Sequence, residues 1–131
     1  MAIPRRAVAG GTVVAILVLG LACGGSGTGP NPPPTAITID LIPDLFDPAD
    51  AVIAAGGTVT WQWTADPDGH DVTSYAVGGS ATFPSIPAFV GVQMVQTIIP
   101  AAGTYYFRCS IHSPTPVGGV CTGMCGKITA E

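Results

Sequence analysis

The fold of this chain is decided by the stretch Gly103-Thr104-Tyr105-Tyr106-Phe107-Arg108-Cys109-Ser110-Ile111-His112. In it, the less polar side chains of Tyr105, Phe107 and Cys109 stand at every second position. Because successive side chains of an extended strand point to opposite faces, this alternation predicts a strand with one buried face. The strand runs into a loop that carries a thiol and, after two intervening residues, an imidazole.

The same period of two recurs earlier in the chain. Residues 37–41 place isoleucine or leucine at every second position, and residues 59–63 do so with valine and tryptophan. Weaker strand candidates are residues 70–75, 93–99 and 126–130. No amphipathic helix of useful length is evident. The pattern predicts an all-β fold, an antiparallel β-sandwich of about seven to eight short strands.

Composition excludes several classes of protein. The chain has 131 residues, of which 47% are hydrophobic and only 9% are charged. A disordered acidic tail would have the opposite balance. Four lysines and arginines in total are too few for a nucleic-acid-binding surface, which needs clustered cations. The length allows one folded domain.

The N-terminus has the features of an export signal. Arg5 and Arg6 precede an uncharged, mostly apolar run at residues 7–22, which is too short for a bilayer-spanning helix. The sequence around Cys23 resembles a bacterial lipobox, which implies a lipidated cysteine; an ordinary signal peptide is the alternative. We therefore expect a signal peptide at 1–22 and an exported protein, in the periplasm or at the cell surface, attached to the membrane only through its lipid.

A linker and a single domain follow. Residues 23–35 hold the lipidation site and a Gly/Pro-rich tether, and residues 36–131 form the expected domain. Once the signal is removed, Arg108 and Lys127 stand against eight acids. This charge favours a basic protein partner over nucleic acid or an anionic membrane surface.

Side chains able to bind a soft metal ion gather near the C-terminus. Residues 109–125 contain Cys109, His112, Cys121, Met124 and Cys125, whereas His70 lies alone after the Trp61/Trp63 strand. One thiolate, two imidazoles and one weak thioether are the ligands of a blue-copper electron-transfer site.

With these motifs the sequence resembles a plastocyanin/azurin-type cupredoxin over nearly all of residues 36–131. The resemblance rests on Phe46-Asp47-Pro48, Gly57-Thr58-Val59-Thr60-Trp61, Gly69-His70-Asp71-Val72, the stretch 103–112, and Gly123-Met124-Cys125-Gly126-Lys127-Ile128.

The resemblance implies a Greek-key sandwich that binds one type 1 copper ion. His70, Cys109 and His112 would be the equatorial ligands and Met124 the axial one. The implied function is single-electron transfer between redox partners, without enzymatic activity. The partner would be a redox protein of basic character, such as a c-type cytochrome or a copper oxidase, and we expect a monomer.

Two features depart from the family pattern. Residues 113–123 form a longer segment between His112 and Met124 than the family has, and we expect it to bulge over the copper. Asp71 stands where a neutral residue is usual; a carboxylate there would lower the reduction potential or need its own hydrogen-bond donor. Met94 lies in a strand pattern and is expected in the core rather than at the metal.

Cys121 and Cys125 allow several interpretations. Their spacing permits a disulfide across a turn in an oxidising compartment, and free thiols or additional metal ligands are the alternatives. A structural zinc module built from Cys109, His112, Cys121 and Cys125 is a rival from another class. A copper storage or delivery protein and a thiol enzyme using Cys109 and His112 are further alternatives.

Overall fold

The computed structural model describes residues 30–131. The expected signal peptide 1–22, the lipidation site Cys23 and the linker residues 24–29 lie outside this part. Within residues 30–131 there is no helix with the length and apolarity needed to cross a bilayer.

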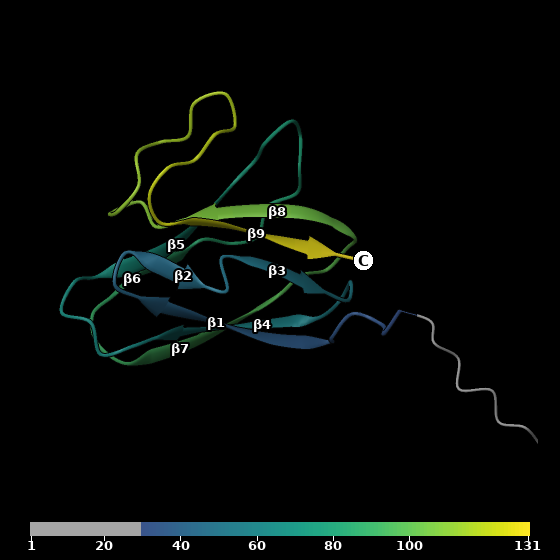
Figure 1. The fold of residues 1–131 in the computed structure, drawn as a ribbon, viewed down its shortest axis with the longest axis horizontal. Coiled ribbons are helices and arrows are strands. Elements are labelled where there is room, and N and C mark those ends of the chain that lie inside the picture. Colours follow the sequence, from purple (N-terminus) through teal and green to yellow (C-terminus); the bar gives the residue numbers. More distant parts are fainter. Residues whose placement is uncertain (1–29) are drawn as a thin grey trace, which may run out of the picture. The chain divides into compact units, whose positions relative to one another are not determined.

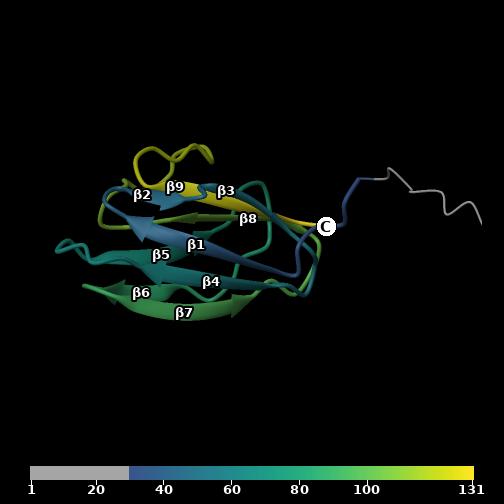
Figure 2. The same ribbon diagram turned by 60° about the horizontal axis from the view of Figure 1, so that its bottom comes forward.

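In the described part of the chain, nine strands form two sheets that pack face to face (Figures 1 and 2). The four-stranded sheet has the order β2-β1-β4-β7 and contains β1 (Ala36–Ile42), β2 (Leu45–Asp47), β4 (Thr58–Trp63) and β7 (Gln93–Ile98). The five-stranded sheet has the order β3-β9-β8-β5-β6 and contains β3 (Asp50–Ile53), β5 (His70–Tyr75), β6 (Ile86–Phe89), β8 (Gly103–Arg108) and β9 (Cys125–Ala130).

The alternating residues build the core between the sheets. Trp61 and Trp63 of β4 and Phe107 of β8 are almost completely buried. Phe107 packs edge-on against Phe46 and Trp61, with ring centroids 4.8 and 4.9 Å apart. Edge-to-face packing suits the aromatic quadrupole. These rings hold the two sheets together beneath the loops that follow β4 and β8.

The β-sandwich is confirmed, with differences in detail. Residues 30–131 contain nine strands rather than seven to eight, because the short strands β2, β3 and β6 show no clear alternation of their own. Two pairs, β1 with β4 and β3 with β9, are parallel rather than antiparallel. The chain leaves the first sheet after β2 and returns to it as β4, so β4 runs in the same direction as β1.

Met94 is not in the core. It lies in β7, as the alternation indicates, but 61% of its surface is exposed. Met94 is paired with Gln62 of β4 on the outer face of the four-stranded sheet. The expectation of a buried Met94 was therefore wrong, because the strand pattern gives the alternation but not which face is inside.

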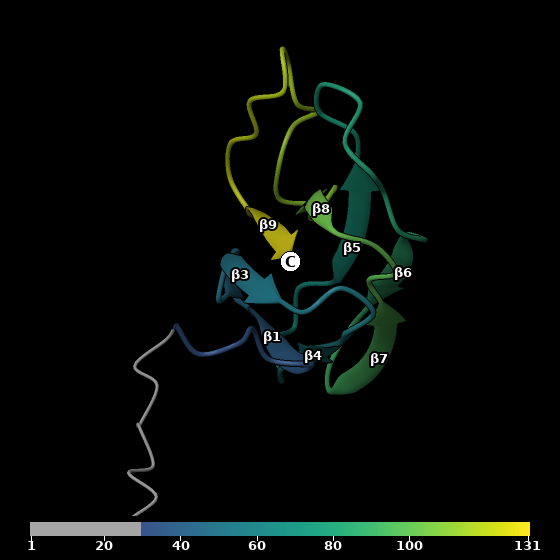
Figure 3. The same ribbon diagram turned by 90° about the vertical axis from the view of Figure 1, so that its right-hand side faces the viewer.

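The long segment between β8 and β9 was expected to bulge over the end of the sandwich that carries Cys109 and His112, but it does not. It rises above the outer face of the five-stranded sheet, beside the β5–β6 loop (Figures 1 and 3). Gly119 packs against Val77 of that loop so closely that a Cβ atom on Gly119 would overlap with it. This contact holds the loop over the sheet.

Gly126 of β9 is a position where only glycine fits. A Cβ atom there would overlap with the carbonyl oxygen of Ala49 and the ring of Phe107. Gly126→Ala is therefore expected to lower the free energy of unfolding of the metal-free protein by about 1–3 kcal/mol, as overpacking does. Gly69→Ala is the matched control, because its Cβ would be in ordinary contact, 3.4 Å from Val90. Urea unfolding measures both; equal stability of the two variants would contradict the packing described.

Candidate metal centre

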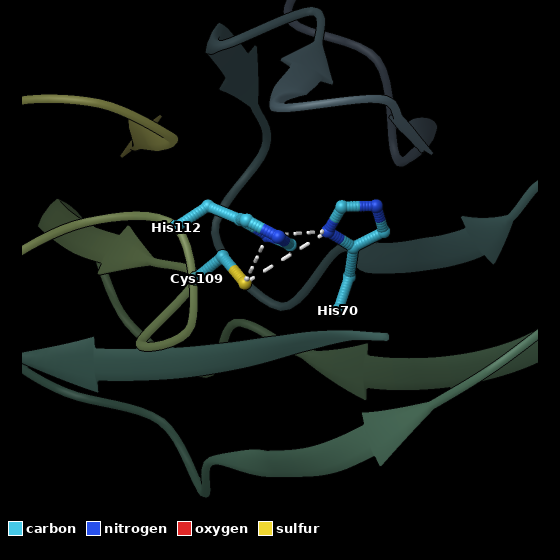
Figure 4. Close-up of side chains that lie close together, drawn as sticks. All are labelled: His70, Cys109 and His112. Carbon is cyan, nitrogen blue, oxygen red and sulfur yellow. Dashed lines mark hydrogen bonds between the residues drawn. The ribbon is translucent and has the colours of Figure 1, made fainter. Parts of the chain in front are cut away.

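Three donor atoms converge at one end of the sandwich (Figure 4). The Sγ atom of Cys109 lies 3.4 Å from Nδ1 of His112 and 3.9 Å from Nδ1 of His70. The two Nδ1 atoms are 3.1 Å apart. Cys109 and His70 are almost completely buried, and the His112 side chain is 19% exposed. The residues predicted from distant parts of the sequence are thus neighbours.

The donor set fits a single soft metal ion. When ligands lie about 2.0–2.3 Å from one first-row ion, neighbouring ligand atoms are separated by about 3–4 Å. The three distances between donors fall in this range. Among residues 30–131, this is the one group of three or more His, Cys, Asp or Glu side chains placed to hold an ion. Thiolate with imidazole suits copper and zinc rather than calcium or magnesium.

His70 is fixed in orientation by contacts on both sides. Its carbonyl oxygen accepts a hydrogen bond from the indole Nε1 of Trp63 at 2.7 Å. Its Nε2 lies 2.9 Å from the carboxylate of Asp66, which is itself buried. Because an ionised carboxylate only accepts hydrogen bonds, Nε2 carries the proton and Nδ1 presents its lone pair toward Cys109. This is the carboxylate–histidine arrangement that supports metal ligands.

The electrostatics of Asp66 agree with this assignment. The hydrogen bond from His70 is the main cause that lowers the pKa of Asp66 below its ordinary value, and the backbone N–H of Asp68 contributes in the same direction. That N–H donates to Oδ1 of Asp66 at 3.0 Å. Asp66 is therefore an anion at neutral pH, and the tautomer of His70 is set by it.

The turn from Cys109 to His112 is closed by its own hydrogen bonds. Ser113 is buried, and its hydroxyl donates to the carbonyl oxygen of Cys109 at 2.6 Å. The guanidinium of Arg108 donates to the carbonyl oxygen of Ser113 at 2.8 Å. These bonds return the chain toward the end of β8, so that His112 faces the sulfur of Cys109.

Asp71 has the donors that a carboxylate at its position needs. Its Oδ1 accepts the backbone N–H of Ser110 at 2.6 Å, and its Oδ2 accepts the hydroxyl of the same residue. Asp71 therefore joins the start of β5 to the residue that follows Cys109. The strand that begins with His70 and the segment that follows β8 are thus tied together directly beside the donors.

Met124 lies next to Cys109 and His112, the two donor residues of the C-terminal loop. Its carbonyl oxygen accepts the N–H of Cys109 at 2.9 Å, and its own N–H donates to the carbonyl oxygen of His112 at 3.4 Å. Met124 is 1% exposed. The long segment before it does not prevent the backbone of Met124 from reaching the metal end; its thioether as a ligand stays a prediction.

Cys121 and Cys125 form a disulfide. A zinc site built from Cys109, His112, Cys121 and Cys125 would need both of these sulfurs as thiolates. With the two sulfurs bonded to each other, that set of four ligands is not available. Cys109 is the free cysteine among the described residues.

His112 is the donor nearest to solvent. Its Nε2 lies 3.8 Å from Oδ1 of Asp44, whose side chain is 81% exposed. Asp44 has a left-handed backbone conformation (φ 58°) in the turn between β1 and β2, which aspartate tolerates better than most residues. The exposed side chains of Val90 and Ile111 flank Gly69 at the same end.

Comparison with known proteins identifies the fold. No family model and no curated protein sequence matches this chain. Three solved structures that match are variants of amicyanin. A methionine-to-glutamine variant with Cu(I) is 24% identical, with a TM-score of 0.56 over 74% of this chain and 83% of amicyanin. A reduced proline-to-phenylalanine variant is 26% identical, with a TM-score of 0.55 over 73% and 82%. An oxidised proline-to-glycine variant is 25% identical, with a TM-score of 0.55 over 84% and 88%. The fold is that of the cupredoxins.

Sequence reasoning missed the residues that support the donors. The stretch Asp66-Pro67-Asp68-Gly69 indicates a turn and by itself gives Asp66 no further role, although its position four residues before His70 is compatible with a contact. Ser113 gave no signal, because a serine in a Pro-rich loop is ordinary. Arg108 alternates with the less polar residues of its strand, and that position gives no sign of its hydrogen bond to Ser113.

Removing the Asp66 carboxylate should weaken metal binding. Asp66→Ala leaves Nε2 of His70 without its partner and is expected to lower Co(II) affinity by about 10–100-fold, the usual effect of losing such a support. A titration followed by the thiolate-to-cobalt absorption measures this. Asp68→Ala is the control, because Asp68 bonds Asp66 through its backbone alone. Wild-type affinity in Asp66→Ala would show that the contact has no role.

Proposed function

We propose that this chain is a type 1 copper protein that carries single electrons between protein partners. The observation that carries the proposal is the convergence of one buried sulfur and two imidazole nitrogens within 4 Å of one another. The amicyanin structures, one of which is described with Cu(I), support it. We infer a carrier rather than an enzyme.

In this function, the protein holds the donor atoms in nearly fixed positions. When bound, copper supplies the one-electron Cu(II)/Cu(I) couple. His70 is held by Trp63 and Asp66, and the Cys109 turn is held by Ser113 and by Met124. Because these supports lie in a close-packed interior, the donors change position little when the charge at the site changes.

Met124 would be the weak fourth ligand. Its buried side chain and its two backbone hydrogen bonds, to Cys109 and to His112, support this role. A weak axial thioether completes the ligand set of such centres and tunes their potential.

The partly exposed edge of His112 is the proposed route for the electron. Asp44 stands beside this edge, and Val90 and Ile111 add apolar surface. A redox protein with cationic side chains around an apolar contact would complement this face. A c-type cytochrome or a copper oxidase of that character would be a suitable partner.

The proposed setting follows from the N-terminal sequence. Arg5 and Arg6, the apolar run 7–22 and Cys23 support export and a lipid anchor. A monomer at the outer side of a membrane would then exchange electrons with partners through the His112 end. The disulfide fits an oxidising compartment.

Binding of Cu(II) should produce an intense blue colour. A thiolate bonded to Cu(II) in a His₂Cys site gives strong charge-transfer absorption in the visible range, and we expect one copper per chain. Cys109→Ser should abolish the band. The paired variant Cys121→Ser/Cys125→Ser is the control and should retain it. Absorption spectroscopy with metal analysis tests this; a pale complex in the wild-type protein would contradict the proposal.

The charge of Asp44 should govern encounters at the His112 edge. At low ionic strength, Asp44→Asn is expected to slow oxidation by a cationic Co(III) complex by about threefold and to speed oxidation by ferricyanide, since one nearby charge contributes about 1 kcal/mol or less in water. Glu131→Gln makes the same charge change beyond the far end of β9 and should alter neither rate much. Stopped-flow kinetics measures the rates. Equal rates for the Asp44→Asn and Glu131→Gln variants would mean that the electron leaves the protein at another part of its surface.

A further inference from the structure

The disulfide encloses the residue next to the metal end. Cys121 and Cys125 close a short ring that contains Thr122, Gly123 and Met124, with the Cα atoms of the two cysteines 6.2 Å apart. A ring this short constrains the unfolded chain much less than a long one does. The position of this disulfide therefore suggests a local role.

The two ends of the ring belong to different kinds of structure. Cys125 is the first residue of β9 and is paired with Arg108, the residue before Cys109, in β8. Cys121 follows directly after the tip of the long loop, where Val117 and Val120 form an isolated bridge. The disulfide thus ties the returning end of the loop to a strand beside Cys109.

The inside of the ring contacts both ligands of the loop. Met124 exchanges backbone hydrogen bonds with Cys109 and His112. Gly123 has a left-handed conformation (φ 84°) and lies so close to His112 that a Cβ atom would overlap with the carbonyl oxygen of His112. A shift of the ring would therefore move Met124 relative to Cys109 and His112.

The loop outside the ring has few supports of its own. Val117 and Val120 are 83% and 67% exposed, and the tip rests on Val77 through Gly119. Motions of such a loop would reach Gly123 and Met124 through the chain if Cys121 were not bonded to β9. The disulfide interrupts that connection.

We propose that the Cys121–Cys125 disulfide is a positioning device that fixes Met124 at the metal centre and isolates it from the long loop. This role rests on the proposed copper function. In the paired variant Cys121→Ser/Cys125→Ser the thioether is held less firmly, so Cu(II) is stabilised less. The reduction potential then rises, in the same direction as in Met124→Leu but by less, and the Cu(II) EPR lines broaden.

A double-mutant cycle tests the coupling between the disulfide and Met124. The potential and the EPR spectrum are measured for the wild type, the paired serine variant, Met124→Leu, and the combination of all three substitutions. The disulfide change should shift the potential in the wild-type background and have little effect once Met124 is leucine. Equal shifts in both backgrounds, or no shift in either, would overturn the proposal.

A control variant of lowered stability distinguishes a specific effect of the disulfide on Met124 from a general loss of stability. Ile53→Val removes a buried methyl group in β3, away from the ring, and should lower the melting temperature while leaving the potential unchanged. A potential shift in Ile53→Val as large as that in the paired serine variant would mean that the disulfide acts only through stability.

A second experiment does not require the protein to fold without the disulfide. In the folded wild-type protein loaded with Cu(I), a water-soluble phosphine opens the disulfide and iodoacetamide caps the two thiols. The capped protein should show the same rise in potential; an unchanged potential would contradict the proposal. A wild-type protein without the blue band would instead refute the copper function itself, so the two failures are distinguishable.

Discussion

The constraint on which this structure depends is that three electron-rich donor atoms are held together in a largely buried space. The sulfur of Cys109 and the Nδ1 atoms of His70 and His112 lie within 4 Å of one another. Without a cation, lone pairs brought this close gain little, so the surrounding framework must hold them. The aromatic core under the loops, the Asp66 contact and the closed turn at Ser113 supply that framework. A soft cation bound between the three donors would make this arrangement favourable.

Negative charge surrounds the site in an ordered way. Asp66 contacts His70, Asp71 is bonded to the residue after Cys109, and Asp44 stands near the outer edge of His112. Each donor residue thus has a carboxylate close by. In the proposed copper protein, these three carboxylates would favour the more highly charged Cu(II) ion and so lower the reduction potential of the copper. Asp44 also combines two proposed roles, because it is exposed enough to meet a cationic partner.

Much of the site was predictable from the sequence, because its signals are local. The alternation in β8 and the Cys109-x2-His112 spacing predicted one donor where a strand ends and a second in the loop that follows, and His70 begins the candidate strand 70–75. Asp66 could not be assigned, because Asp-Pro-Asp-Gly has a sufficient explanation as a turn. The contact with His70 becomes visible only once the loop has a three-dimensional path.

Features set by tertiary contacts were the ones that sequence patterns missed. The long segment 113–123 lies over the five-stranded sheet because Gly119 contacts Val77, a residue far from it in the sequence. Met94 is exposed because β7 pairs with β4 in a register that turns it outward. β3 pairs in parallel with β9, the last strand, and no local sequence pattern near Asp50–Ile53 predicts that pairing.

In the proposed copper protein, Cys109, His70 and His112 bind the same copper ion. X-ray absorption at the copper edge of the loaded protein tests this most directly, because it identifies the atoms bonded to the metal. We expect one short copper–sulfur bond together with bonds to two imidazole nitrogens. A spectrum with oxygen and nitrogen neighbours only, and no short sulfur bond, would contradict it.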